Sequence, residues 1–186
     1  VVNFPTGDER IFSVAGQTER ALADGATEID LVLPYRAFLA GRIGHAAAMV
    51  GAVRATTGGR ARLKVILETG ELPDLDAVRA AAELAVAEGA DFIKTSTGKA
   101  AVSATPDAVT TMLQVIAAAD RPVGIKPSGG ISGADDAERY IGLAEAAMGS
   151  GWVGPATFRF GASSLLAALL DAAGLDDEEP PTPTGY

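Results

Sequence analysis

Apolar positions along the chain follow two spacings, which predict a regular succession of helices and strands. Segments such as "LDAVRAAAELAVAEGA" place apolar residues three or four positions apart, as amphipathic helices do, whereas short apolar runs such as "EIDLVLP" are typical of strands. The predicted strands lie near residues 1–4, 28–33, 62–68, 92–95, 123–126 and 157–160. Strands that alternate with helices of this length indicate βαβ units and a parallel sheet, so the predicted fold class is α/β.

Four consecutive predicted strands each carry one charged residue at a similar position. These residues are Asp30, Lys64, Lys94 and Lys126, which are separated by 34, 30 and 32 residues, about the length of one βα unit. Right-handed crossovers point parallel strands the same way, so the four charges would meet at the C-terminal mouth if the sheet curls into a barrel. Barrel enzymes keep their active sites there. For Lys64 a second interpretation stays open, in which it lies low in the barrel at a solvated edge.

Composition narrows the chemistry that this cluster could perform. The 186 residues include no cysteine and a single histidine, His45, which disfavours disulfides, thiolate catalysis, zinc sites and Ser-His-Asp chemistry. The net charge of −9, without any basic run, disfavours nucleic acid as a partner. Apolar runs stay well short of the roughly 20 residues of a membrane span, so no membrane partner is expected. The lack of cysteine fits a cytoplasmic location.

Two lysines and one carboxylate are the groups that Schiff-base chemistry needs. A lysine amine attacks a carbonyl carbon only when it is neutral, and its ordinary pKa of about 10.4 must be lowered for it to react near neutrality. Burial and a second ammonium nearby both lower that pKa. Lys94 and Lys126 are predicted to lie on neighbouring strands and so suit this pairing. Asp30 could move protons directly or through water, although it could also be a structural acid.

The two glycine-rich loops that follow the last predicted strands indicate a phosphate site. "KPSGGIS" contains Gly129 and Gly130, and "RFGASSLL" places Gly161, Ser163 and Ser164 at the start of a helix. Backbone N–H groups, hydroxyls and a helix N-terminus together bind phosphate well. Barrels frequently build their phosphate site from the last two βα loops. The residues therefore predict a small phosphorylated carbonyl compound as substrate.

Several motifs together resemble the deoxyribose-phosphate aldolase family. They are "EIDLVLPYRAFLAG", "LKVILETGEL", "ADFIKTSTGK", "VGIKPSGGIS" and "FRFGASSLLAALL". The resemblance covers essentially the whole chain. It implies an eight-stranded (β/α)8 TIM barrel and a class I aldolase, a lyase that uses no metal or organic cofactor. It also implies reversible cleavage of 2-deoxy-D-ribose 5-phosphate to acetaldehyde and D-glyceraldehyde 3-phosphate, in deoxyribonucleoside catabolism.

The same resemblance implies a role for each matching residue. Lys94 would form the Schiff base, Lys126 would tune it and activate a proton-relay water with Asp30, and Lys64 would be a supporting charge. Thr97 would contact the substrate. The phosphate would be held by Gly129, Gly130, Gly161, Ser163 and Ser164. The implied partners are small phosphorylated sugars and aldehydes, and a homo-oligomer is possible.

The two ends of the chain carry further expectations. Residues 1–175 are predicted to form the aldolase domain, and residues 176–186 ("DDEEPPTPTGY") an acidic, proline-rich tail. Some members of the family end in a tyrosine that assists proton transfer, so Tyr186 is a candidate for that role. "VVNFP" resembles the third strand of the family. We therefore expect a partial barrel of about six βα units that lacks the first two strands, with doubtful activity on its own.

Two departures and two alternatives complete the sequence-based hypotheses. Thr6 stands where the family often has histidine, and Ser132-Gly133 replaces a basic-hydroxyl pair, which would weaken phosphate affinity. One alternative is a different Schiff-base sugar-phosphate aldolase, such as a transaldolase-like barrel. The other is a non-catalytic sugar-phosphate-binding barrel fragment. Release of acetaldehyde would exclude the first, and trapping of substrate with borohydride would exclude the second.

Overall fold

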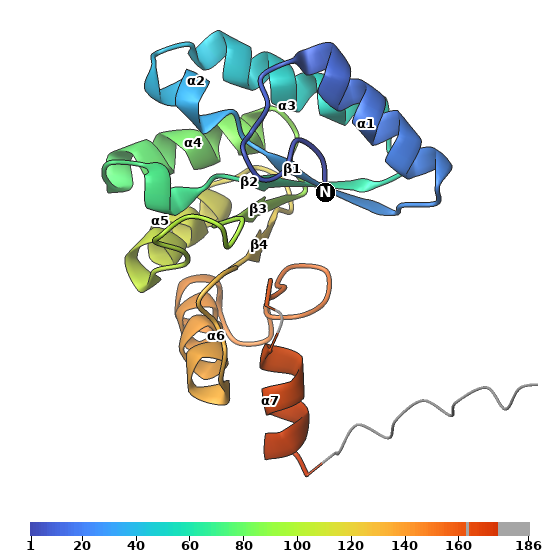
Figure 1. The fold of residues 1–186 in the computed structure, drawn as a ribbon. Coiled ribbons are helices and arrows are strands. Elements are labelled where there is room, and N and C mark those ends of the chain that lie inside the picture. Colours follow the sequence, from blue (N-terminus) through green and yellow to red (C-terminus); the bar gives the residue numbers. More distant parts are fainter. Residues whose placement is uncertain (163, 175–186) are drawn as a thin grey trace, which may run out of the picture.

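The protein is a parallel sheet flanked by helices, as Figure 1 shows for a computed structural model that describes residues 1–162 and 164–174. The strands are β1 (Glu28–Val32), β2 (Arg62–Ile66), β3 (Phe92–Lys94) and β4 (Gly124–Lys126). The helices are α1 (Ile11–Ala23), α2 (Tyr35–Leu39), α3 (Ile43–Thr57), α4 (Leu75–Ala87), α5 (Pro106–Ala117), α6 (Ala134–Met148) and α7 (Leu165–Ala172), with a short 3₁₀ turn η1 (Thr69–Glu71). No helix in this described part is long and apolar enough to cross a membrane.

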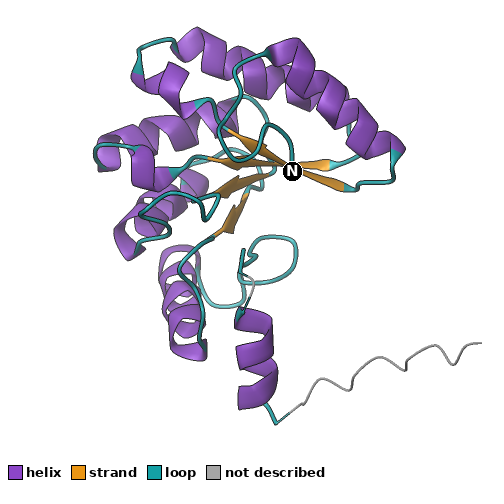
Figure 2. Cartoon of the chain, viewed as in Figure 1, coloured by secondary structure: helices purple, strands orange, loops and turns teal. Residues whose placement is uncertain are grey.

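The strands pair in the order of the sequence, β1-β2-β3-β4, and every pair is parallel. Figure 2 shows the helices arranged around the outside of the curved sheet. A parallel sheet in chain order, with each strand followed by a helix, is the repeating arrangement of a (β/α)8 barrel. The α/β prediction from the hydrophobic pattern is therefore confirmed.

Alternation along the strands gives the sheet two different faces. The side chains facing the helices are aliphatic and at most 1% exposed: Ile29, Leu31, Leu63, Val65, Ile93 and Ile125. They belong to one apolar core with residues of α3, α4 and α5, including Met49, Val50, Val53, Ala81, Ala82, Met112 and Leu113. The opposite face, called the inner face below, carries the charged residues Asp30, Lys64, Lys94 and Lys126. Burying the aliphatic face orients the sheet and therefore points these charges inward.

Local capping explains where two of the helices begin. The Asp74 carboxylate accepts a hydrogen bond from Ala77 N–H at 2.8 Å and caps α4. Thr105 caps α5 in the same way, and Pro106 occupies the first turn, where its missing N–H is no loss.

The two outermost predicted strands pair only through isolated bridges. Near the N-terminus, Val2 bridges Leu31, but Asn3 turns into the left-handed region at φ 46° and leaves the ladder. Its side chain replaces the missing backbone pairing, because Oδ1 accepts from Val32 N–H and Nδ2 donates to Val32 O, both at 2.9 Å. The prediction of six strands thus becomes four strands plus two bridged segments among the described residues.

Proline interrupts pairing on the other edge of the sheet. Phe158 bridges Ile125, and Gly161 bridges Ser128, but Pro127 lies between the two bridges and has no N–H to donate. Its carbonyl still accepts from Gly161 N–H at 2.8 Å. The segment 157–161 therefore stays beside β4 and carries its glycine to the C-terminal end of the sheet without forming a continuous strand.

We predict that Gly124→Ala destabilises the fold by about 1–3 kcal/mol. A Cβ at this position would overlap the Phe92 ring, which packs directly over it on the inner face. Gly142→Ala is the matched control, because nothing lies within 4 Å of a Cβ there and alanine favours the α6 helix by about 0.5–1 kcal/mol. Urea unfolding of both variants checks the prediction. Equal stability of the two variants would contradict it.

Candidate active site

One carboxylate on the inner face binds three ammonium groups. Asp30 Oδ1 accepts from Lys64 Nζ at 2.8 Å, and Oδ2 accepts from Lys94 Nζ at 3.0 Å and from Lys126 Nζ at 2.9 Å. All four residues come from different neighbouring strands, β1 to β4. The meeting of the strand-end charges that the 30–34-residue spacing predicted is therefore present in the structure.

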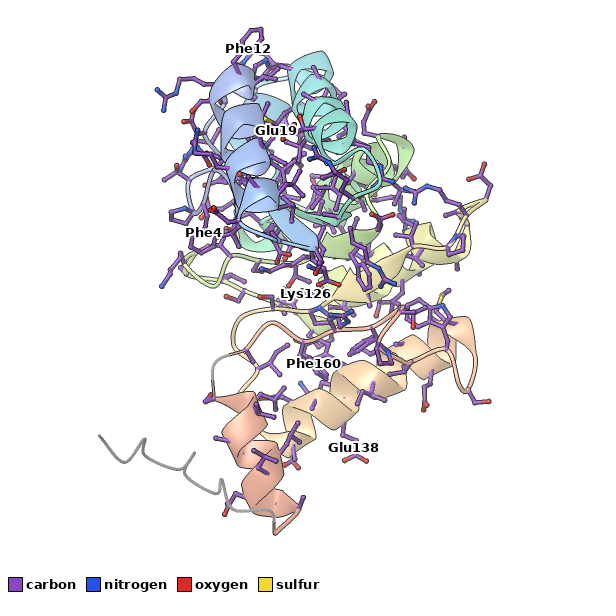
Figure 3. All side chains as sticks on the ribbon, turned by 90° about the vertical axis from the view of Figure 1, so that its right-hand side faces the viewer. Phe4, Phe12, Glu19, Lys126, Glu138 and Phe160 are labelled. Carbon is purple, nitrogen blue, oxygen red and sulfur yellow. The ribbon has the colours of Figure 1, made fainter. Side chains whose placement is uncertain are left out.

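Strand register explains why these four groups can meet. Asp30 pairs with Lys64 across β1 and β2, and Lys94 pairs with Lys126 across β3 and β4. Lys94 also pairs with Ile66, two residues beyond Lys64, so the second pair lies one layer nearer the C-terminal end. The carboxylate therefore reaches toward that end of the sheet. Figure 3 shows Lys126 in the middle of the molecule, between the strands and the segment that carries Phe160.

Burial and charge act in opposite directions on the Asp30 carboxyl. Burial, the largest single influence, favours the neutral acid, but the hydrogen bonds from Lys126 and Lys64 and the charges of Lys94 and Lys126 together outweigh it. The net effect holds the pKa of Asp30 well below its ordinary value. Asp30 is therefore ionised at neutral pH and accepts hydrogen bonds from the three lysines.

At Lys94, in contrast, burial outweighs the effect of the oppositely charged neighbour on the pKa. Burial is again the largest influence and lowers the pKa of Lys94, because the residue is only 6% exposed. The Asp30 carboxylate opposes this shift, whereas the Lys126 and Lys64 ammonium groups add to it. The net pKa lies below the ordinary lysine value. A larger fraction of Lys94 is consequently neutral near physiological pH, which is what a nucleophilic amine requires.

Lys64 lies inside the protein and not at a solvated edge. It is 4% exposed and divides its ammonium between Asp30 and Glu28, the latter at 2.8 Å from Nζ. Glu28 in turn binds Arg159 at 3.2 Å, and the Arg159 guanidinium lies 5.7 Å from the Phe92 ring centre. The hydrogen bond from Lys64 holds the pKa of Glu28 below its ordinary value. The ion pairs thus continue from Asp30 toward the N-terminal end of the strands.

Sequence reasoning missed Glu28 and Arg159. Glu28 lies two residues before Asp30 and therefore on the same face of β1, which is a usable signal in a strand of alternating pattern. Arg159 has no such signal, because it belongs to the interrupted segment at the far edge of the sheet.

The loops that follow β3 and β4 are hydrogen-bonded to each other, just beyond Lys94 and Lys126 along the chain. Thr95 Oγ1 donates to Ser128 O at 3.1 Å and accepts from Ser128 N–H at 2.9 Å. Gly129 N–H donates to Gly161 O at 3.2 Å, which fixes the last loop to the one before it. Gly129 and Gly130 both adopt positive φ, 83° and 73°, which other residues adopt only with strain. These contacts hold the glycine-rich loops in one arrangement.

A pocket of about 480 Å³ opens between these loops and Lys94. Four of the predicted phosphate residues line it, Gly129, Gly130, Gly161 and Ser164, and Thr97 lines it too. The remaining lining residues are Gly98, Lys99, Ser128, Ile131, Ser132 and Ala162. The structure thus brings the Lys94 amine and the glycine-rich loops to one cavity. Lys64, Lys126 and Asp30 are not among its lining residues, and the predicted roles of Ser163 and Tyr186 fall outside the described residues.

Lys99 is a pocket residue that sequence reasoning missed. It follows Thr97 and Gly98 in "STGK" and lines the pocket from the β3–α5 loop. A lysine in a glycine-containing loop just beyond the candidate nucleophile was the available signal. Lys99 supplies a positive charge to the same cavity as Ser132, where the expected basic residue is absent.

Asp30→Asn is predicted to lower the free energy of unfolding by about 3 kcal/mol at pH 7, because three buried ammonium groups lose their shared anion. The pKa of Asp30 is lowered by folding, so its contribution is present above the unfolded value of about 3.9 and is lost as pH falls through the folded value. The deficit of the variant should therefore shrink progressively below about pH 4. Asp24→Asn, at an exposed helix end, is the matched control.

Urea unfolding of both variants at pH 7 and pH 3 measures this effect. A deficit of Asp30→Asn that is as large at pH 3 as at pH 7 would contradict the electrostatic origin.

Comparisons with known proteins show the family of this chain. A profile described as DeoC/LacD family aldolase matches residues 2–171. A deoxyribose-phosphate aldolase from Agrobacterium fabrum is 54% identical over 171 residues, which are 92% of this chain and 66% of that relative, so the chain spans just under two thirds of it.

Solved structures give the same result. The tetrameric deoxyribose phosphate aldolase from Aeropyrum pernix superposes with a TM-score of 0.73 at 27% identity, covering 94% of this chain and 67% of that one. An apo-form structure from Toxoplasma gondii, provisionally assigned as a deoxyribose-phosphate aldolase, superposes with a TM-score of 0.86 at 30% identity over 95% of this chain and 71% of that one. Sequence, fold and site together show that this chain belongs to the DeoC/LacD family of aldolases.

Proposed function

We propose that the protein is a class I aldolase that reversibly cleaves 2-deoxy-D-ribose 5-phosphate to acetaldehyde and D-glyceraldehyde 3-phosphate. The observation that carries the proposal is the buried Lys94 amine, whose pKa is lowered and which faces the pocket formed by the glycine-rich loops. A buried amine with a lowered pKa suits an aldehyde group, and a cavity lined by glycine-rich loops beside it suits a phosphate group. Together they favour a phosphorylated aldehyde as substrate. The Agrobacterium relative carries the name of this activity.

The chemistry begins at the Lys94 nitrogen. The neutral amine attacks C1 of the open-chain sugar, and loss of water leaves a protonated imine that can accept electrons. A base then removes the proton from the C3 hydroxyl, the C2–C3 bond breaks, and its electrons form an enamine with Lys94. Glyceraldehyde 3-phosphate leaves at this point. Protonation of C2 and addition of water to the imine then release acetaldehyde and restore the amine.

The neighbouring charges would perform the proton transfers. Asp30 Oδ2 accepts hydrogen bonds from both Lys94 and Lys126, so a proton released at one of the three groups has a short path to the others. A water held by Lys126 and Asp30 would serve as the base at C3. Lys64 remains bound to the other oxygen of Asp30 and keeps that carboxylate oriented.

The pocket loops would bind the phosphate. Gly129 and Gly130 line the pocket with positive φ angles, although Gly129 N–H is already bound to Gly161 O, and Ser164 stands at the N-terminal end of α7. Helix N-termini and glycine-rich turns favour anions because their N–H groups lack partners within the helix. Lys99 would add a charge-assisted contact from the opposite loop.

Other expectations stay predictions. A homo-oligomer is supported by the tetrameric Aeropyrum relative. The cytoplasmic location, the domain boundary at residue 175 and the role of Tyr186 rest on the sequence alone. Among the described residues no group of three or more His, Cys, Asp or Glu side chains forms a metal site.

Borohydride trapping tests the proposed function. Reduction in the presence of acetaldehyde should add a stable ethyl group to Lys94, which peptide mass spectrometry locates. Lys94→Met should abolish the adduct, whereas Lys99→Met should keep it, because Lys99 is outside the buried cluster. Cleavage of deoxyribose 5-phosphate should fall at least 1,000-fold in Lys94→Met, the size of effect expected when covalent catalysis is removed.

Two outcomes would oppose the proposal in different ways. An adduct on a lysine other than Lys94 would remove the assigned nucleophile. Trapping at Lys94 without release of acetaldehyde from deoxyribose 5-phosphate would favour another Schiff-base sugar-phosphate aldolase.

A further inference from the structure

Glu68, just beyond the end of β2, adopts a backbone conformation that a long side chain disfavours. Its φ of 55° and ψ of 57° lie in the left-handed region. Only one other non-glycine residue in the described ranges, Asn3, has a positive φ. Glu68 is also just 2% exposed. Strained residues of this kind gather at functional sites, where surrounding contacts hold them in place.

Backbone hydrogen bonds on both sides of Glu68 hold this conformation. Leu67 N–H donates to Lys94 O at 2.9 Å, and Thr69 N–H donates to Thr95 O at 3.0 Å. The chain around Glu68 is therefore fastened to the end of β3, immediately beside the candidate nucleophile. A glycine would satisfy this backbone without strain, so the presence of glutamate indicates that its side chain is needed.

Among the described residues, the hydrogen bonds to the Glu68 carboxylate all come from one residue of the pocket, Thr97. Oε1 accepts from Thr97 N–H at 3.1 Å, and Oε2 accepts from Thr97 Oγ1 at 2.5 Å. Thr97 Oγ1 also accepts from Lys99 N–H at 3.1 Å. A chain of hydrogen bonds therefore runs from the strained residue through Thr97 to Lys99, and both of these residues line the pocket.

This arrangement fixes the direction of the Thr97 hydroxyl. A carboxylate can only accept hydrogen bonds, so the hydroxyl proton must point at Glu68. One of the two lone pairs of the oxygen is used by Lys99 N–H. The remaining lone pair is the only hydrogen-bonding capacity that Thr97 Oγ1 can offer to a molecule in the pocket, and it can only accept.

We propose that Glu68 is a positioning residue that presents the Thr97 oxygen to the substrate as a hydrogen-bond acceptor and holds the 97–99 loop against the pocket. The inference rests on the proposed function and makes it more specific. The substrate group that meets Thr97 is a donor, as a sugar hydroxyl is, and a compound lacking that hydroxyl loses this contact.

The test compares Glu68→Gln with Glu71→Gln, which makes the same change on an exposed residue of the adjacent η1 turn. The carboxamide keeps the shape but places an N–H₂ group toward either the N–H or the hydroxyl of Thr97. Two readouts are used. Amide hydrogen exchange of the peptide containing residues 97–99 is measured without substrate, and kcat and KM are measured for deoxyribose 5-phosphate.

Glu68→Gln should speed exchange of this peptide about tenfold and lower kcat/KM about tenfold, whereas Glu71→Gln should match the wild type. Acetaldehyde trapping at Lys94 should stay within twofold, because acetaldehyde has no hydroxyl group to donate to Thr97. Thr97→Val should cause a similar loss of kcat/KM, and Thr97→Ser, which keeps the hydroxyl, should restore most of it. The double variant Glu68→Gln/Thr97→Val should be no worse than Thr97→Val within twofold, because both changes break the same chain.

Three results would overturn the inference: exchange and kinetics of Glu68→Gln equal to those of Glu71→Gln, losses that multiply in the double variant, or loss of acetaldehyde trapping together with sugar cleavage. Failure of the proposed function has a different signature, namely no trapping at Lys94 in the wild type. The exchange comparison still decides whether Glu68 holds the loop in that case.

Discussion

The Asp30 carboxylate is the group on which the inner face of this protein depends. Three lysine side chains from three successive strands converge on its two oxygens. Without it, Lys94 and Lys126 would place uncompensated positive charges in a buried space, and Lys64 would keep only Glu28. In the proposed reaction the same contact keeps the Asp30 carboxyl ionised, while burial lowers the pKa of Lys94. Stability and reactivity are thus set by one balance between desolvation and charge.

The parallel sheet makes this convergence possible. Its aliphatic face packs against the helices, so the alternate positions of each strand must point inward, and the register then places the four charges in two adjacent layers. The loops at the C-terminal ends of β3 and β4 are joined by the Thr95–Ser128 hydrogen bonds, which place the pocket directly beyond the lysines. The fold therefore places a buried lysine amine and a pocket lined by glycine-rich loops within one short stretch of strand ends.

Much of this could be predicted from the sequence, because periodic features determine it. The alternating helices and strands and the recurrence of Asp30, Lys64, Lys94 and Lys126 follow directly from spacing. Features set by contacts between distant segments could not be predicted. Arg159 reaches the cluster only because the edge segment folds back beside β4, and Pro127 and Asn3 replace continuous edge strands with isolated bridges. The left-handed conformation of Glu68 likewise has no local sequence signal.

The pKa of Lys94 is the quantity on which the proposed Schiff-base chemistry depends most directly. It can be obtained from the pH dependence of competitive acetylation at Lys94, followed by peptide mass spectrometry, in the wild type and in Lys126→Met. We expect a wild-type pKa below the ordinary value of about 10.4 and a higher pKa in the variant, because removing Lys126 removes a like charge and leaves Asp30 to its remaining partners. A wild-type pKa at or above the ordinary value, or no rise in Lys126→Met, would contradict this expectation.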